Sequence, residues 1–150
     1  MQSGIDGLLL LKTTDSAFPG FLRDEYTTLP ETDDRIFATM LTTHWRYRDP
    51  QADWDNCHRL IRRTLLEVFA LHRSLSVQQT LCAMGAAAVD ACPAIEEITL
   101  TMPNQHRLLV NLKPFDLDNP NEVFMPTDEP YGLICGTIRR GQGSSKHPLG

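Results

Sequence analysis

The spacing of apolar positions along the chain predicts five strands. The apolar run GLLLLKTT, residues 7–14, indicates a strand that is buried on both faces. Residues 36–47 alternate between apolar and polar side chains, which predicts a second strand with one buried face. Residues 95–102 and 106–113 are predicted as two further strands, and residues 131–140 as a last strand added to them.

Between the second and third predicted strands, the apolar spacing changes to steps of three and four and predicts two amphipathic helices. The first begins after Asp53, a suitable N-cap, and its apolar stripe consists of Trp54, Cys57, Ile61, Leu65, Val68 and Leu71. The second begins at SVQQ, residues 76–79, a capping-box pattern that places Val77 and Gln78 at the first two helical positions. Its stripe of Leu81, Met84, Ala88 and Ala91 ends before Cys92-Pro93.

The order of these elements predicts an α+β fold. Strand pairs that flank a helix pair favour an antiparallel sheet with both helices packed on one face, in β-β-α-α-β-β order plus an added C-terminal strand. Residues 1–140 are expected to form this single domain, with a long ordered loop at 114–130 and a flexible tail at 141–150. Two helices can cover only one face of the sheet, so we expect another copy or another domain to cover the other face.

Composition narrows the class of protein. The chain has 150 residues, 41% hydrophobic and 22% charged, as expected for one soluble globular domain. Its net charge of −5 argues against a general nucleic-acid binder, and the basic residues Arg59, Arg62 and Arg63 fit a solvated helix face. The apolar run at residues 8–11 is too short to span a membrane or to form the core of a signal peptide.

The cysteines predict free thiols. Cys57, Cys82, Cys92 and Cys135 include no CxxC pair, and none has a histidine at the spacing of a metal site, so we expect no zinc. Free thiols are typical of a reducing compartment, and the cytoplasm is therefore the expected location.

Two candidate ligand groups lie between the first two predicted strands. Phe18 occupies the polar loop AFPGF, where it either packs back onto the core or contacts a ligand. Arg35 follows an acidic stretch, so its guanidinium either pairs with a carboxylate at residues 31–34 or binds a flat anion.

Two more candidate groups come later in the chain. Val77 and Gln78 occupy a helix N-terminus, which is either a plain cap or an anion site made by free N–H groups. Asn104 and His106 are two residues apart, and His106 shares the apolar face of residues 106–113. The histidine is either a satisfied core residue or part of a pocket. Taken alone, the residues indicate a site for a small, flat, anionic ligand.

Four stretches resemble the urate oxidase family. They are LLLLKTTDSAFPGFLRDEYTTLPETDDR at 8–35, SVQQT at 76–80, MPNQH at 102–106 and DNPNEVF at 118–124, and the resemblance is collinear from about Gly4 to Arg140. It implies a tunnelling fold (T-fold), in which two such units per chain assemble into oligomeric, tetramer-like barrels with the helices outside. It also implies oxidation of urate by O2 to 5-hydroxyisourate and hydrogen peroxide, without metal or organic cofactor.

The resemblance also implies a role for each candidate. By position, Phe18 stacks on the purine ring, Arg35 and Gln78 hold opposite edges of urate, and the Val77 backbone donates a hydrogen bond. Asn104 lies over the ring, where oxygen or water binds. His106 belongs to a proton relay, and with Asn104 it faces a pocket at the end of the strand.

The chain departs from the family in two respects. It resembles only the C-terminal half, whereas the N-terminal half supplies a Lys–Thr pair that deprotonates urate and a Thr–Asp pair from a neighbouring subunit. Lys12-Thr13 lies in the first strand of this half and is not assigned that role, and Gln105 stands where a lysine is common. Three hypotheses follow: an enzyme completed by an N-terminal half, a purine-binding module without turnover, and an inactive fragment.

Overall fold

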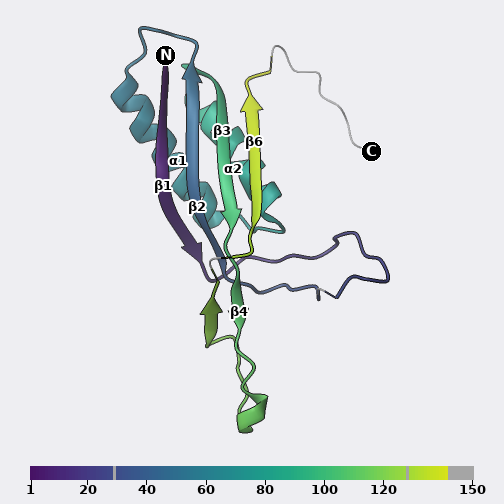
Figure 1. The fold of residues 1–150 in the computed structure, drawn as a ribbon. Coiled ribbons are helices and arrows are strands. Elements are labelled where there is room, and N and C mark those ends of the chain that lie inside the picture. Colours follow the sequence, from purple (N-terminus) through teal and green to yellow (C-terminus); the bar gives the residue numbers. More distant parts are fainter. Residues whose placement is uncertain (29, 128, 142–150) are drawn as a thin grey trace.

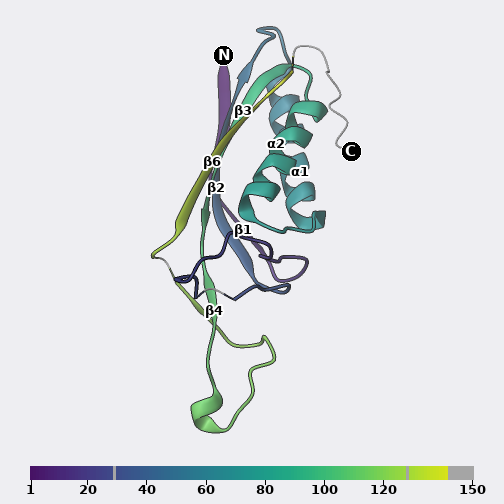
Figure 2. The same ribbon diagram turned by 90° about the vertical axis from the view of Figure 1, so that its right-hand side faces the viewer.

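The α+β class predicted from the sequence is confirmed by the computed structural model, which describes residues 1–28, 30–127 and 129–141. An antiparallel sheet has the strand order β1-β2-β3-β6, and two helices cover one of its faces (Figures 1 and 2). The sheet strands are β1 (Gln2–Lys12), β2 (Phe37–Tyr47), β3 (Ile95–Asn104) and β6 (Gly132–Arg139). The helices are α1 (Trp54–Leu71) and α2 (Val77–Ala91). Neither helix is both long enough and apolar enough to cross a membrane.

Both helices begin where their capping residues predict. Asp53 accepts a hydrogen bond from the Asn56 N–H at 3.0 Å, and Ser76 accepts one from the Gln79 N–H at 3.1 Å. The predicted stripe of α1 is correct at Cys57, Ile61 and Leu65 but wrong at its ends. Leu71 is 83% exposed, and Phe69 is the buried residue of the last turn because it lies one helical turn beyond Leu65.

The edge strand β1 is longer and more exposed than predicted. It starts at Gln2, where its polar residues pair with the far end of β2. Leu10 faces the helices and is buried, whereas Leu9 and Leu11 are 59% and 53% exposed on the opposite face. Residues 7–14 are therefore covered on one face only in the single chain.

Residues 106–113 do not form the predicted half-buried strand. Only β4 (Arg107–Leu109) is extended, and it pairs with β5 (Phe124–Pro126) in a separate two-stranded sheet. The two strands belong to an arm, residues 106–127, that projects beyond the main sheet (Figure 2) and contains a 3-10 turn, Lys113–Phe115. Leu108 is 48% exposed, so the alternation does not mark a core face. β6 takes the fourth place in the sheet instead.

Of the predicted tail at residues 141–150, only Gly141 lies within the described residues. The division into a domain at 1–140 and a flexible tail thus remains a prediction.

A glycine allows the close approach of β1 to β2. A Cβ at Gly4 would lie 2.5 Å from the Thr43 carbonyl oxygen, an atom that cannot move without the backbone. We therefore expect Gly4→Ala to lower the free energy of unfolding by roughly 1–2 kcal/mol in urea titrations, because the start of β1 must separate from β2. Ser3→Ala, one residue away, is the control and should change it by less than about 0.5 kcal/mol. Equal effects of the two substitutions would contradict this account.

The buried cysteines should react slowly with alkylating agents. Burial raises the pKa of the Cys57 thiol to about 11, and the neighbouring Cys92 thiol adds to the increase. At pH 8 only about one part in a thousand of Cys57 is then the reactive thiolate. Mass spectrometry after iodoacetamide treatment should show Cys82 and Cys135, which are exposed, labelled first. Labelling of Cys57 should accelerate about tenfold per pH unit up to its pKa; a rate independent of pH would contradict the prediction.

Candidate functional site

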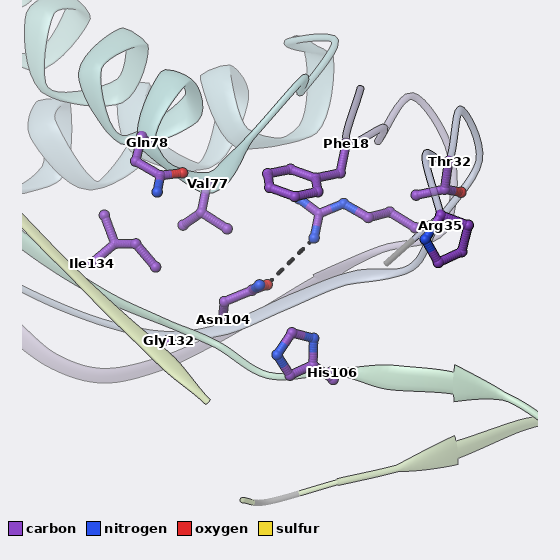
Figure 3. Close-up of a pocket in the computed structure, with 10 residues that line it drawn as sticks. Phe18, Thr32, Arg35, Val77, Gln78, Asn104, His106, Gly132 and Ile134 are labelled. Carbon is purple, nitrogen blue, oxygen red and sulfur yellow. Dashed lines mark hydrogen bonds between the residues drawn. The ribbon is translucent and has the colours of Figure 1, made fainter. Parts of the chain in front are cut away.

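All six candidate residues from the sequence line one pocket of about 380 Å³. The pocket lies where β3 ends, β6 begins and α2 begins, so its walls come from segments that are far apart in the sequence (Figure 3). Its lining residues are Phe18, Pro30, Thr32, Arg35, Val77, Gln78, Asn104, His106, Gly132 and Ile134. This volume is in the range of cavities that bind small molecules.

Phe18 is a wall of the pocket and not a plug in the core. The chain leaves β1 through Asp15, whose φ of 53° turns the backbone, and the Phe18 N–H then donates to the Thr32 carbonyl at 2.7 Å. The Phe18 ring stacks on Phe21 with 4.9 Å between centroids and 12° between planes. Because its ring is half-buried beside the cavity, it presents a flat apolar surface to a ligand.

Arg35 reaches the pocket with its hydrogen-bonding capacity incompletely used. Its Nε donates to the Ala17 carbonyl at 3.2 Å, and its Nη1 donates to the Asn104 side-chain oxygen at 3.4 Å (Figure 3). Its Nη2 is buried and has no hydrogen-bond partner. No ion pair among the described residues includes Arg35, so the predicted alternative of a carboxylate partner is wrong for them.

The Arg35 guanidinium is buried beside two aromatic rings, and its Nη2 has no acceptor. Burial lowers the pKa of its guanidinium, because the charged form loses solvation. The guanidinium carbon lies 5.8 Å from the centroid of the Phe18 ring and 5.2 Å from that of Phe37. These ring faces offer a weak attraction to the charge but no acceptor for Nη2.

The start of α2 supplies unpaired backbone donors. Ser76 caps the Gln79 N–H, and the Gln79 side chain in turn accepts from the Leu75 N–H at 2.8 Å. The N–H groups of Val77 and Gln78 precede the first intrahelical hydrogen bonds and have no partner within the helix. Val77 is buried, whereas the Gln78 side chain is exposed at the cavity (Figure 3).

Asn104 and His106 lie at the end of β3 and just beyond it. The Asn104 side chain points toward Arg35, and the His106 ring lies at the opposite edge of the pocket (Figure 3). The His106 backbone is fixed, because its carbonyl accepts from the Thr127 N–H at 3.1 Å and the Thr127 hydroxyl at 3.2 Å. His106 is exposed, so the alternative of a core histidine is wrong.

Sequence reasoning missed four lining residues: Pro30, Thr32, Gly132 and Ile134. Gly132 is the register partner of Asn104 across the β3–β6 ladder, and Ile134, two residues later, lies on the same face. Alternation within the last strand indicates that these two share a face. It does not give the register that places them beside Asn104.

The pocket favours an anion electrostatically. Among its described lining residues, Arg35 is the only permanently charged side chain, and none is acidic. The partial positive charge of the α2 N-terminus has the same sign. The described residues contain no group of three or more His, Cys, Asp or Glu side chains that could hold a metal ion.

Lys12 does not line this pocket. Its side chain is 9% exposed, and its ammonium donates to the carbonyl of His72, the C-cap of α1. Burial lowers the pKa of the Lys12 ammonium. Thr13 borders a second hollow with Asp34 and Asn121. Neither residue of the Lys12-Thr13 pair lines the candidate site.

The uricase family model matches residues 1–135 of the chain. The chain belongs to the uricase family. It is 49% identical over 147 residues to uricase from Arthrobacter globiformis, an alignment that covers 98% of this chain and 49% of the relative. It is 41% identical over 138 residues to uricase from Dictyostelium discoideum, covering 92% of this chain and 48% of the relative.

Solved uricase structures show the same fold. The crystal structure of uricase from Arthrobacter globiformis matches with a TM-score of 0.92 over 98% of this chain and 51% of that one, at 49% identity. A urate oxidase from Bacillus sp. TB-90 matches with a TM-score of 0.77 over 93% of this chain and 47% of that one, at 27% identity. The expected tunnelling fold is thereby confirmed. The chain spans about half the length of the uricases it matches.

Replacement of Arg35 by methionine should change the free energy of unfolding only slightly. Arg35→Met keeps much of the volume but removes a buried charge with an unpartnered nitrogen. We expect the free energy of unfolding to stay within about 1 kcal/mol of wild type in urea titrations, since lost hydrogen bonds and relieved desolvation offset each other. Arg35→Ala, which leaves a void between Phe18 and Phe37, is the comparison and should cost about 2 kcal/mol more. A loss with Arg35→Met as large as with Arg35→Ala would show that the charge stabilises the fold.

Proposed function

We propose that this chain forms part of a urate oxidase that binds urate in the pocket between Phe18, Arg35 and the start of α2. The observation that carries the proposal is the buried, unpartnered Nη2 of Arg35, in a pocket that also contains an unpaired helix N-terminus. A flat anion with acceptors on opposite edges satisfies both sets of donors. Urate has this shape and charge, and the chain belongs to the uricase family.

In this proposal three segments hold the substrate. The Phe18 ring stacks on the purine, which is planar and polarisable. Arg35 donates to one edge of the anion through its planar fork of N–H groups. The side-chain amide of Gln78 and the backbone N–H of Val77 contact the opposite edge, where the helix dipole adds to the attraction.

Asn104 and His106 would act on the oxidant and on protons. The overall reaction consumes urate, O2 and water and yields 5-hydroxyisourate and hydrogen peroxide. Two electrons leave the purine and reduce O2 to peroxide, and the oxygen of water forms the new bond at C5. In this proposal the Asn104 amide orients O2 or water above the ring, and the His106 imidazole relays protons. The proposal includes no metal or organic cofactor.

A second tunnelling-fold unit would complete the site. The open face of the sheet and the half-length match to the uricases both favour a further domain or subunit, and residues 1–140 would be one unit of that oligomer. His106 is the only histidine of the described lining, which contains no lysine and no carboxylate, so the group that activates urate with it would come from this partner. We place the assembly in the cytoplasm, where its free thiols stay reduced.

A second candidate function is purine binding without turnover. It is favoured by the absence of a lysine from the described lining of the cavity, where such a side chain could deprotonate urate. Lys12, six residues before Phe18, contacts the His72 carbonyl instead. The two functions share the same ligand contacts and differ only in whether oxygen is consumed.

The decisive measurement is the loss of urate absorbance in aerated buffer containing a chelator, with the chain alone and with the N-terminal half of a uricase added. We expect turnover only in the mixture. The anaerobic dissociation constant for urate should increase at least about a hundredfold in Arg35→Ala, because a charge-assisted pair is lost. Arg63→Ala, which removes an exposed arginine of α1 that pairs with Glu67, is the matched control and should change neither quantity.

Each other outcome has a defined meaning. Urate binding without turnover in the mixture would support the purine-binding module. No binding, together with aggregation in size-exclusion chromatography, would identify an inactive fragment. Turnover by the chain alone would contradict the need for a partner.

A further inference from the structure

A cluster of fully buried hydroxyl groups lies behind the pocket and does not line it. Ser16, Ser74 and Thr80 are all 0% exposed. They come from the segment after β1, from the α1–α2 connection and from the first turn of α2. These are the segments that carry Phe18 and the helix N-terminus.

The backbone of Ser74 is paired with the segment that leads to Phe18. Its N–H donates to the Asp15 carbonyl at 2.8 Å, and its carbonyl accepts from the Ala17 N–H at 2.7 Å. The two segments run parallel at this point. Phe18 follows directly, so the position of its ring depends on this short pairing.

The other side of the same segment is hydrogen-bonded to Arg35. The Arg35 N–H donates to the Ser16 carbonyl at 2.9 Å, and its Nε donates to the Ala17 carbonyl at 3.2 Å. Residues 15–18 therefore lie between Ser74 and Arg35. A displacement of Ser74 would therefore shift both the Phe18 ring and the Arg35 side chain.

The Ser74 hydroxyl connects this pairing to α2. It donates to the Ser76 carbonyl at 3.2 Å and accepts from the Thr80 hydroxyl at 2.8 Å. Ser76 is the N-cap and Thr80 lies in the first turn, so the hydroxyl contacts both sides of Val77 and Gln78. The Thr80–Ser74 bond is buried, where water cannot replace it, and the Ser74–Ser76 bond is partly buried.

We propose that Ser74 is a positioning residue, which through Thr80 holds the N-terminus of α2 at a fixed separation from Phe18 and Arg35. The inference rests on the proposed function, because it concerns ligand groups of the same pocket. Groups from three separate segments must meet one rigid planar ligand. A shift of about 1 Å in any of them weakens contacts to the ligand while leaving the fold intact.

The chain offers matched variants to test this role. Thr80→Val removes the hydroxyl–hydroxyl bond alone, and Ser74→Ala removes it together with the bond to the Ser76 carbonyl. Thr80→Ser keeps both bonds and removes only a methyl group. Ser16→Ala is the control, because the Ser16 hydroxyl is equally buried but has no hydrogen-bond partner. Each variant is compared by its anaerobic dissociation constant for urate, by its melting temperature and, without ligand, by hydrogen exchange of residues 15–18 and 76–80.

We expect Thr80→Val to raise the dissociation constant for urate about tenfold, the value of one buried hydrogen bond, and Ser74→Ala to raise it at least as much, since it also removes the bond to the Ser76 carbonyl. The double variant should bind no more weakly than Ser74→Ala, because both changes remove the same bond. Exchange should accelerate at residues 15–18 as well as at the helix start. Thr80→Ser and Ser16→Ala should bind urate within about twofold of wild type, whatever their melting temperatures.

Four results would overturn the inference or separate it from the proposed function. If Thr80→Ser weakens binding as much as Thr80→Val, packing and not the hydroxyl bond is responsible. If affinity and exchange follow the melting temperature equally in all variants, Ser74 is only structural. If the wild-type chain does not bind urate, the proposed function fails. If hydrogen exchange at residues 15–18 is unchanged in Ser74→Ala, the Ser74 hydroxyl does not connect α2 to the Phe18 segment, and the inference fails.

Discussion

Antiparallel pairing of the sheet strands determines where the pocket forms. Because neighbouring strands run in opposite directions, β1 and β3 end at the same edge at which β2 and β6 begin (Figure 1). The α1–α2 connection returns the chain to this edge, so the N-terminus of α2 opens there too (Figure 2). Every ligand group of the proposed site lies at or close to an end of one of these elements. The backbone hydrogen bonds of the sheet thus fix the positions of the loops that carry the candidate side chains.

The free pocket concentrates donors that lack acceptors. A buried guanidinium nitrogen without a partner and a helix N-terminus carry charge of the same sign, which costs folding free energy in the empty state. The cost is tolerable because the neighbouring Phe18 and Phe37 rings present their faces to Arg35 and the rest of its fork is hydrogen-bonded. An anion bound there, as proposed, would relieve both deficits at once. The same feature would then lower stability and raise affinity.

The helices and the candidate residues were predictable because their signals are local. Ser76 with Gln79 fixes the start of α2 within one turn, and the apolar steps of α1 fix its buried face except at the ends. The strand at 106–113 was predicted wrongly because alternation reports a possible strand but not its partner, and the partner here is the three-residue β5. Gly132 and Ile134 could not be placed at the site without the register of β6 on β3. The buried hydrogen bonds around Ser74 could not be predicted either, because they join segments about sixty residues apart.

The open face of the sheet has two chemically different ends. At the pocket end it presents the exposed apolar side chains of Leu9, Met40 and Leu133: Leu9 pairs with Met40 across the strands, and Leu133 pairs with the half-buried Pro103. At the other end Glu97 pairs with Arg139 at 2.8 Å and with Arg46 at 3.2 Å, an arrangement that water can solvate. The apolar end gains more from being covered, since burial of such surface stabilises by about 25 cal/mol per Å². A second unit that covered it would lie beside the pocket, where the proposed site lacks a group to activate urate with His106. Assembly and completion of the site would then depend on the same surface.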